Sequence, residues 1–139
     1  MAAALRQIHQ DEYSTLTYSA ADGVFRFTRT TAQYPSIAAM MHSYDALLRL
    51  LATDFHGYAS PRLLVDMRQA PARNDPEFER AHGPRRRQLL AGFVRVATLV
   101  NSPVGILHIE RFAREDRAQH IQGFQDERLA LRYLQEPVE

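Results

Sequence analysis

A short apolar run, Leu63-Leu64-Val65, constrains the fold of this chain more than any other feature. It does not alternate with polar residues, which is the pattern of a strand covered on both faces. Asp66 and Arg68 follow the run, and Pro71 forces a turn before a helix begins near Asn74. Because the carboxyl ends of parallel strands carry the ligand-facing crevice in open α/β sheets, a binding site is expected here.

The rest of the chain alternates between predicted strands and helices. Two strands, 13–19 and 24–30, are joined by the turn signal Ala20-Ala21-Asp22-Gly23 into an antiparallel hairpin. The strongest helix spans 36–55, with apolar residues at spacings of three and four, an entry at Pro35 and a stop at Gly57. Further strands are expected at 93–100 and 120–124, and further helices from residue 74, at 104–114 and from a cap at Asp126.

Two of these helices carry conflicting local signals. Asn74 and Glu77 have the spacing of a capping box, but Gly83-Pro84 inside the same helix predicts a kink or a break. The segment 104–114 has apolar spacing compatible with a helix or a strand. The helix is preferred, because Ser102 can cap it and Pro103 suits its first position.

A hairpin followed by alternating helices and strands predicts a single α/β domain. The expected architecture is a mixed sheet of about five strands, parallel after the hairpin, with helices packed against it. Residues 1–12 are assigned to an N-terminal extension, 13–135 to the domain and 136–139 to a C-terminal tail. The length of 139 residues suits one domain of this kind.

Composition excludes several classes of function. There is no cysteine, hence no disulfide frame or thiolate site, and no lysine, hence no Schiff-base chemistry. A formal charge of +1 provides no bulk field for nucleic acid. No apolar run approaches the roughly 20 residues that span a bilayer, and the first residues lack a secretory pattern, so a cytoplasmic location is expected.

No motif in the chain indicates a reaction. Glu79-x-x-His82 has metal-ligand spacing but no second pair, so neither a metal nor a cofactor is expected. There is no Gly-x-Ser-x-Gly elbow and no phosphate-binding glycine loop. The basic cluster of Arg80 with Arg85-Arg86-Arg87 is interpreted as a solvated helix face rather than a nucleic-acid surface, with an acidic or phosphorylated partner as the alternative.

Several segments together resemble a known family. The segments LLVDMR, FVRVATLV and FQDERLALRYL resemble the SpoIIAA-like family of the wider STAS fold, over about residues 13–135. The resemblance implies a binding or regulatory module without catalysis. In one branch of that fold a serine or threonine at the start of the helix after the central strand is phosphorylated. Here Arg73-Asn74-Asp75 occupies that place, so a phosphate switch is not expected.

The same resemblance extends to lipid-binding domains of the Sec14 type. It implies an apolar ligand held between the long helix and the sheet. The residues that could line such a pocket are Met40, Met41, Tyr44 and Phe78. The alternative is that these side chains are ordinary core.

Two functional hypotheses follow. The first is a non-enzymatic STAS-like module that binds a protein or an acidic ligand at the carboxyl end of the sheet through Asp66, Arg68, Arg73, Asn74, Asp75, Asn101 and Ser102. It requires exposed arginines, so a structure that consumes Arg68 and Arg73 in internal ion pairs away from any cleft would contradict it. The second is a carrier or sensor of an apolar small molecule or lipid. A homodimer is plausible, and membrane contact is expected to be peripheral at most.

Overall fold

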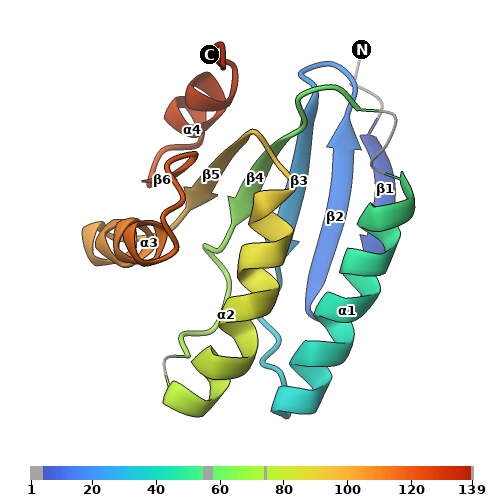
Figure 1. The fold of residues 1–139 in the computed structure, drawn as a ribbon, viewed down its shortest axis with the longest axis vertical. Helices are drawn as coiled ribbons and strands as arrows, with labels where there is room; N and C mark the ends of the chain where they lie inside the picture. The colour runs from blue at the N-terminus through green and yellow to red at the C-terminus, as the bar shows by residue number, and fades with distance from the viewer. Residues whose placement is uncertain (1–4, 55–57, 74, 139) are drawn as a thin grey trace.

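The computed structural model describes residues 5–54, 58–73 and 75–138, and shows one six-stranded sheet whose strands follow the chain in order (Figure 1). The strands are β1 (Leu5–Gln10), β2 (Ser14–Ser19), β3 (Val24–Arg29), β4 (Arg62–Asp66), β5 (Arg95–Leu99) and β6 (Ile121–Phe124). The first three pair antiparallel, and β3 to β6 are parallel. The predicted hairpin, the α/β class and the parallel half of the sheet are therefore confirmed.

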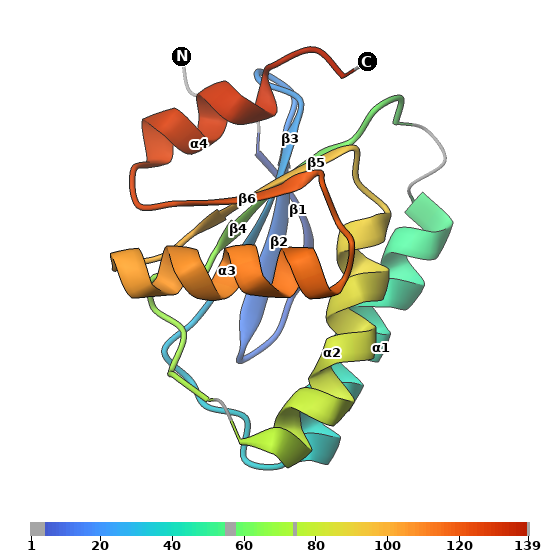
Figure 2. The same cartoon turned by 60° about the vertical axis from the view of Figure 1, so that its left-hand side comes forward.

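Four helices cover the two faces of this sheet. They are α1 (Ile37–Asp54), α2 (Pro76–Ala91), α3 (Pro103–Glu115) and α4 (Glu127–Leu134). The first two lie side by side on one face, and Figure 2 shows α3 and α4 on opposite sides of β6. Gly123 of β6 faces α3: a Cβ added there would lie 3.4 Å from Ile106 Cα and 3.4 Å from Ile109 Cβ. No helix among the described residues is long and apolar enough to cross a membrane.

The sheet has six strands where about five were predicted. The additional strand is β1, which falls within residues 1–12, the stretch assigned to an extension. Its sequence, LRQIHQ, lacks a clear apolar alternation, because an edge strand buries little of either face. Pairing with β2 places it in the sheet, with a register shift between Gln7 and His9.

The two conflicting helices are now resolved. The helix preferred for 104–114 is confirmed as α3, and Ser102 caps it by accepting a hydrogen bond from Gly105 N. A kink or a break was predicted at Gly83-Pro84; the break is wrong, because α2 continues through this pair. Buried Phe78 and Leu89 hold the two halves of α2 against the same core, which offsets the donor lost at Pro84.

Helix boundaries agree with the sequence pattern where the structure describes them. The cap of α2 is Asp75, which accepts a hydrogen bond from Phe78 N, rather than the predicted Asn74. Asn74 and the predicted helix stop at Gly57 lie outside the described residues. Asp126 caps α4 as predicted, accepting from Arg128 N and Leu129 N.

The alternation along the central strands divides the core into two layers. Phe25 and Phe27 of β3 pack with Leu63 and Val65 of β4 under α1 and α2. Leu64 points the other way and packs with Val24, Ala97 and the buried face of α4. Odd positions of β4 thus face α1 and α2, and even positions face α4. Asp66, at the end of β4, belongs to the α4 side.

Alanine substitutions at two helical glycines, Gly83 and Gly105, should change the free energy of unfolding in opposite directions. An added Cβ at Gly105 would lie 2.9 Å from Val100 Cβ, whereas at Gly83 its nearest neighbour is the flexible Arg87 Nη1 at 3.3 Å. We expect Gly83→Ala to raise the free energy of unfolding by up to about 1 kcal/mol through helix propensity. Gly105→Ala should lower it by about 1 kcal/mol, because the backbone must shift. Urea denaturation measures both, and equal signs would contradict the packing described here.

Candidate functional site

The loop after β4 supplies side chains to two different places. Asp66 and Arg68 lie on the α4 side of the sheet, in an ion-pair cluster. Met67, Pro71 and Arg73 line a groove on the α2 side. The alternation of β4 continues past its end, and it separates residues that the sequence grouped as one site.

The ion-pair cluster consists of Arg26, Asp66, Arg68 and Glu127. Arg68 binds Asp66 through two side-chain bonds, Nε to Oδ1 at 2.9 Å and Nη2 to Oδ2 at 2.8 Å. Its Nη2 also lies 3.1 Å from Glu127 Oε1, and Arg26 Nη2 lies 3.1 Å from Glu127 Oε2. Each charge in the cluster has a partner of opposite sign, so the cluster ties α4 to the ends of β3 and β4.

These contacts hold both carboxylates in the charged form. Hydrogen bonds from Arg68 lower the pKa of Asp66, and hydrogen bonds from Arg26 lower the pKa of Glu127. Because the two pKa values are lower in the folded than in the unfolded protein, both carboxylates stabilise the fold at pH values above the ordinary carboxyl pKa. This stabilisation is lost as the pH falls through the lowered pKa values. The cluster, called the clamp below, is therefore structural, and within it Arg68 is paired with Asp66 and Glu127.

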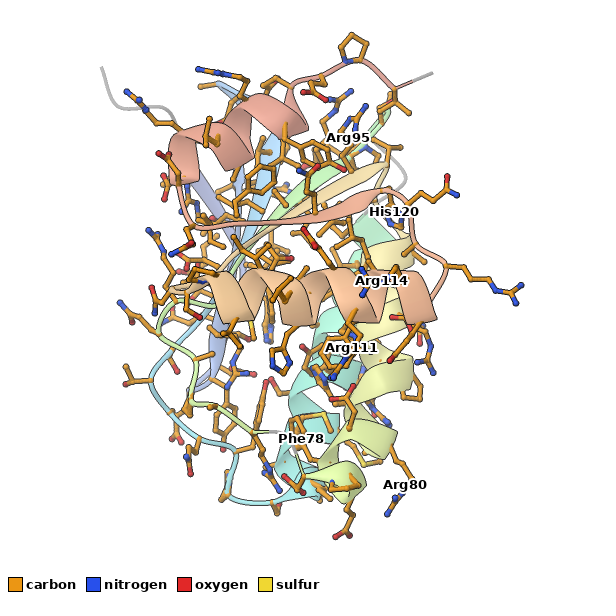
Figure 3. All side chains as sticks on the ribbon, turned by 90° about the vertical axis from the view of Figure 1, so that its left-hand side faces the viewer. Phe78, Arg80, Arg95, Arg111, Arg114 and His120 are labelled. Carbon is orange, nitrogen blue, oxygen red and sulfur yellow. The ribbon has the colours of Figure 1, made fainter. Side chains whose placement is uncertain are left out.

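The groove opens at the carboxyl ends of β3 and β4, between α2 and α3, with a volume of about 250 Å3. Its lining includes Arg29, Arg73, Arg86 and Arg111, with Glu79 as the one carboxylate among the lining residues. Figure 3 shows Arg111 on α3 above Phe78 of α2, both on the side of the molecule where the groove opens. A crevice at this edge of the sheet was predicted, but most of its arginines were not.

Arg29 is the most unusual of these cations. It is 6% exposed, and its Nε and Nη2 donate to the main-chain oxygens of Tyr13 and Ala32. Its guanidinium carbon lies 4.4 Å from the centre of the Tyr34 ring. Among the described residues no carboxylate lies within ion-pair distance, 4.0 Å, of it. A buried cation without a counterion is costly, unlike the paired arginines of the clamp.

Two further residues that line the groove each have a buried polar atom without a hydrogen-bond partner. Arg86 Nε is buried and has no hydrogen-bond partner, although the other nitrogens of this guanidinium bind Glu79 and Asp116. Tyr34 Oη makes no hydrogen bond of normal geometry, although Ser43 is close enough to lower its pKa slightly against the larger effect of burial, which raises it. Unpaired buried donors of this kind are uncommon in native proteins and mark places where a ligand can bind.

A neutral hydrogen-bonded pair lies where the groove meets a second cavity: His82 lines both spaces, and Tyr44 lines the second one. His82 Nε2 lies 2.9 Å from Tyr44 Oη, and the His82 ring stacks on Phe78 with 5.2 Å between centroids. Burial, together with the nearby positive charges of Arg86 and Arg29, lowers the pKa of His82 to about 3. Burial also raises the pKa of Tyr44. Both side chains are therefore uncharged at neutral pH. Of the Glu79-x-x-His82 pair, Glu79 forms an ion pair with Arg86 and His82 hydrogen-bonds Tyr44.

A second, apolar cavity of about 70 Å3 adjoins the groove. The two share the side chains of Met67, His82, Arg86, Ile109 and Phe112. This second space, called the inner cavity below, extends between α2 and α3 toward β5, where apolar residues dominate its lining. The site thus combines a basic mouth with an apolar interior.

The other predicted binding residues lie around the groove in structural roles. Arg73 lines it, pairs with Asp75 at 2.8 Å and stacks on Phe78. Asp75 and Ser102 cap α2 and α3, and the Asn101 side chain donates to the main-chain oxygen of Arg68. Of the two arginines that the first hypothesis requires to be exposed, Arg68 is thus ion-paired in the clamp, and Arg73 borders the groove.

The four side chains predicted for an apolar pocket separate into two groups. Met40 is completely buried, and Met41 packs against the same core. Tyr44 lines the inner cavity and Phe78 lines the groove. The cavities that they reach lie between α2 and α3 rather than between the long helix and the sheet, because α1 closes tightly over β2 to β4.

Sequence reasoning missed Arg29, Tyr34, Arg86 and Arg111 as groove residues. A signal for Arg29 was present, because it continues the inward alternation of Phe25 and Phe27 and so places a charge on the buried face of a strand. The basic cluster on α2 contained Arg86, but helical spacing alone could not show that it points toward α3. Its neighbours pair elsewhere: Arg85 with Asp45 and Arg87 with Asp116.

Together, the fold and the groove define an α/β domain with a ligand-sized basic crevice at the carboxyl ends of its parallel strands. No protein-family model, curated protein or solved structure matches the chain.

Proposed function

We propose that this protein is a non-enzymatic binding module of STAS-like type that recognises a small anionic ligand in the groove between α2 and α3. The observation that carries the proposal is Arg29, a buried guanidinium that lines the groove without a carboxylate partner among the described residues. An anion bound there would supply the missing counterion. It would also give Arg86 Nε or Tyr34 Oη an acceptor at no cost to the existing ion pairs.

The chemistry of the lining favours binding over catalysis. His82, which lines the groove, and Tyr44 behind it are held neutral by burial and hydrogen-bond each other. A general base needs a pKa near the working pH, and the pKa of His82 lies well below it. Arginines are suited to holding an anion through directed hydrogen bonds.

The second hypothesis, a carrier of an apolar molecule, gains support from the inner cavity. Apolar side chains from α2, α3 and the sheet line this space. A volume of about 70 Å3 is, however, smaller than the roughly 150 Å3 cavity that accommodates benzene, so a whole lipid chain does not fit. Native mass spectrometry of the freshly purified protein separates the two hypotheses, since a co-purifying lipid would favour the carrier.

Replacing Arg29 tests the anion-binding proposal. Calorimetric titration of the protein with phosphate and with acetate should show binding that weakens with rising salt. Arg29→Met should reduce the affinity at least about tenfold, the effect of losing one charge-assisted contact. The matched control is Arg49→Met, which removes an exposed arginine on α1.

Two results would contradict the proposal. One is wild-type protein that binds no anion at low salt. The other is an equal loss of affinity in Arg29→Met and Arg49→Met, which would show that net charge rather than the groove attracts the ligand. Circular dichroism of both variants establishes that each remains folded.

A further inference from the structure

We infer that the anionic ligand carries a compact apolar group, and that this group enters the inner cavity while the anion binds at the arginines. This inference rests on the proposed function and specifies its ligand class: a small organic anion, carboxylate or phosphate ester, with a short branched apolar part. The shared walls of the groove and the inner cavity carry it.

The first step is that the two spaces are neighbours. Ile109 and Phe112 of α3 line both, as do His82 and Arg86 of α2. A molecule anchored near Arg86 therefore lies beside the entrance to the inner cavity. Its apolar part can leave water by entering this cavity between α2 and α3.

The second step is that the polarity changes sharply between the spaces. The groove carries arginines from β3, the loop after β4, α2 and α3, whereas the inner cavity is walled mainly by the side chains of Val65, Leu89, Ala113 and Ile121. Inorganic phosphate or sulfate would satisfy the arginines but would leave the apolar walls without a partner. A purely apolar molecule would leave Arg29 without a counterion.

The third step is that Arg86 stands at the boundary. Its guanidinium carbon lies 4.4 Å from the centre of the Phe112 ring, and its ion pairs with Glu79 and Asp116 hold it in place. The buried Nε of this fixed side chain has no partner. An anionic oxygen that reaches this Nε would give it an acceptor and would place the apolar part of the ligand beside Phe112.

The volume limits the apolar group. A cavity of about 70 Å3 is about half the size of one that holds benzene, so it accommodates a branched group of roughly three or four carbon atoms. Burying such a group adds about 0.8 kcal/mol for each methylene, which corresponds to an affinity gain of about fiftyfold for three carbons.

The test is a titration of the purified protein with acetate, isovalerate and decanoate, and with methyl phosphate and isobutyl phosphate. We expect isovalerate to bind about fiftyfold more tightly than acetate and decanoate to bind more weakly than isovalerate. The two phosphate esters should show the same gain from the branched group, and the tighter pair identifies the anionic group that the site prefers.

A cavity-filling variant localises the effect. Ala113→Leu places a larger side chain in the inner cavity and should reduce isovalerate binding about tenfold while leaving acetate binding unchanged. Ala52→Leu makes the same change at an exposed position of α1 and should leave both affinities unchanged. If Ala113→Leu does not fold, Ile109→Phe narrows the same space from a partly exposed position.

The possible failures are distinguishable. Binding of acetate and isovalerate with equal affinity, or decanoate binding as tightly as isovalerate, overturns the inferred ligand class and leaves the anion site standing. Absence of binding by every anion in the series overturns the proposed function itself. A loss of isovalerate binding in Ala52→Leu equal to that in Ala113→Leu also overturns the inference, because the gain would then not arise in the inner cavity.

Discussion

Replacement of Asp66 by alanine is expected to lower the free energy of unfolding by about 3 kcal/mol. The Asp66 side chain is only 10% exposed, and it accepts hydrogen bonds from the main chain and the side chain of Arg68. Its removal leaves two arginines with Glu127 as their remaining carboxylate in the clamp. Urea denaturation at pH 7 measures the loss.

Two comparisons isolate the contribution of the clamp. Asp66→Asn keeps an acceptor at the same place and should cost less than Asp66→Ala. Glu115→Ala removes an exposed partner of Arg111 on α3 and should change stability by less than about 0.5 kcal/mol. If Asp66→Ala were as mild as Glu115→Ala, the clamp would contribute no more than a surface ion pair.

The second large effect is a dependence of stability on pH that originates at His82. Its pKa falls to about 3 in the folded protein, so between pH 7 and 5 the unfolded chain takes up a proton that the folded chain does not. Stability is therefore complete above the unfolded pKa of about 6.5 and decreases as the pH falls below it. We expect a loss of about 2 kcal/mol between pH 7 and 5 from this group alone.

Replacement of His82 by glutamine should remove most of this slope, because glutamine does not titrate. The matched control is His42→Gln, on the exposed side of α1, which should preserve the slope. Urea denaturation at pH 5, 6 and 7 provides the measurement. The carboxylates of the clamp contribute little in this range, since their lowered pKa values place their effect at more acidic pH. An unchanged slope in His82→Gln would contradict the buried, neutral state of this side chain.

The clamp and the groove use arginine in opposite ways. Arg68 has two carboxylates within 3.1 Å, so its charge is balanced inside the protein. Arg29 is more buried and has main-chain oxygens as its hydrogen-bond acceptors. The sequence shows both as arginines following apolar strands, and only the positions of distant segments distinguish them. Glu127, which completes the clamp, is 59 residues from Arg68 in the chain.

Much of the fold could be predicted because local patterns report burial directly. The run Leu63-Leu64-Val65 required cover on both faces, and its residues do pack alternately into two core layers. The caps at Ser102 and Asp126 and the long apolar stripe of α1 also specified their elements locally. The edge strand β1 was not predicted, because it pairs with β2 alone and buries few side chains, so its apolar pattern is weak.

The candidate site could be predicted as a region but not as a set of residues. The carboxyl end of the parallel strands is where the groove lies, and Arg73 and Phe78 border it. Which arginines remain available depended on where Asp66, Glu79, Asp116 and Glu127 came to lie. These are distances between segments far apart in the chain, and no residue spacing contains them.

The sequence by itself determined the α/β class, the order of its main elements and the edge of the sheet at which a site belongs, because burial periodicity and capping are local properties. Only the tertiary structure decided that Arg68 is neutralised under α4, while Arg29 lines the groove with no ion-pair partner in the part of the chain that the structure describes. Ion pairing acts over a few ångströms through space, so the outcome for each charge depends on which helix packs over it.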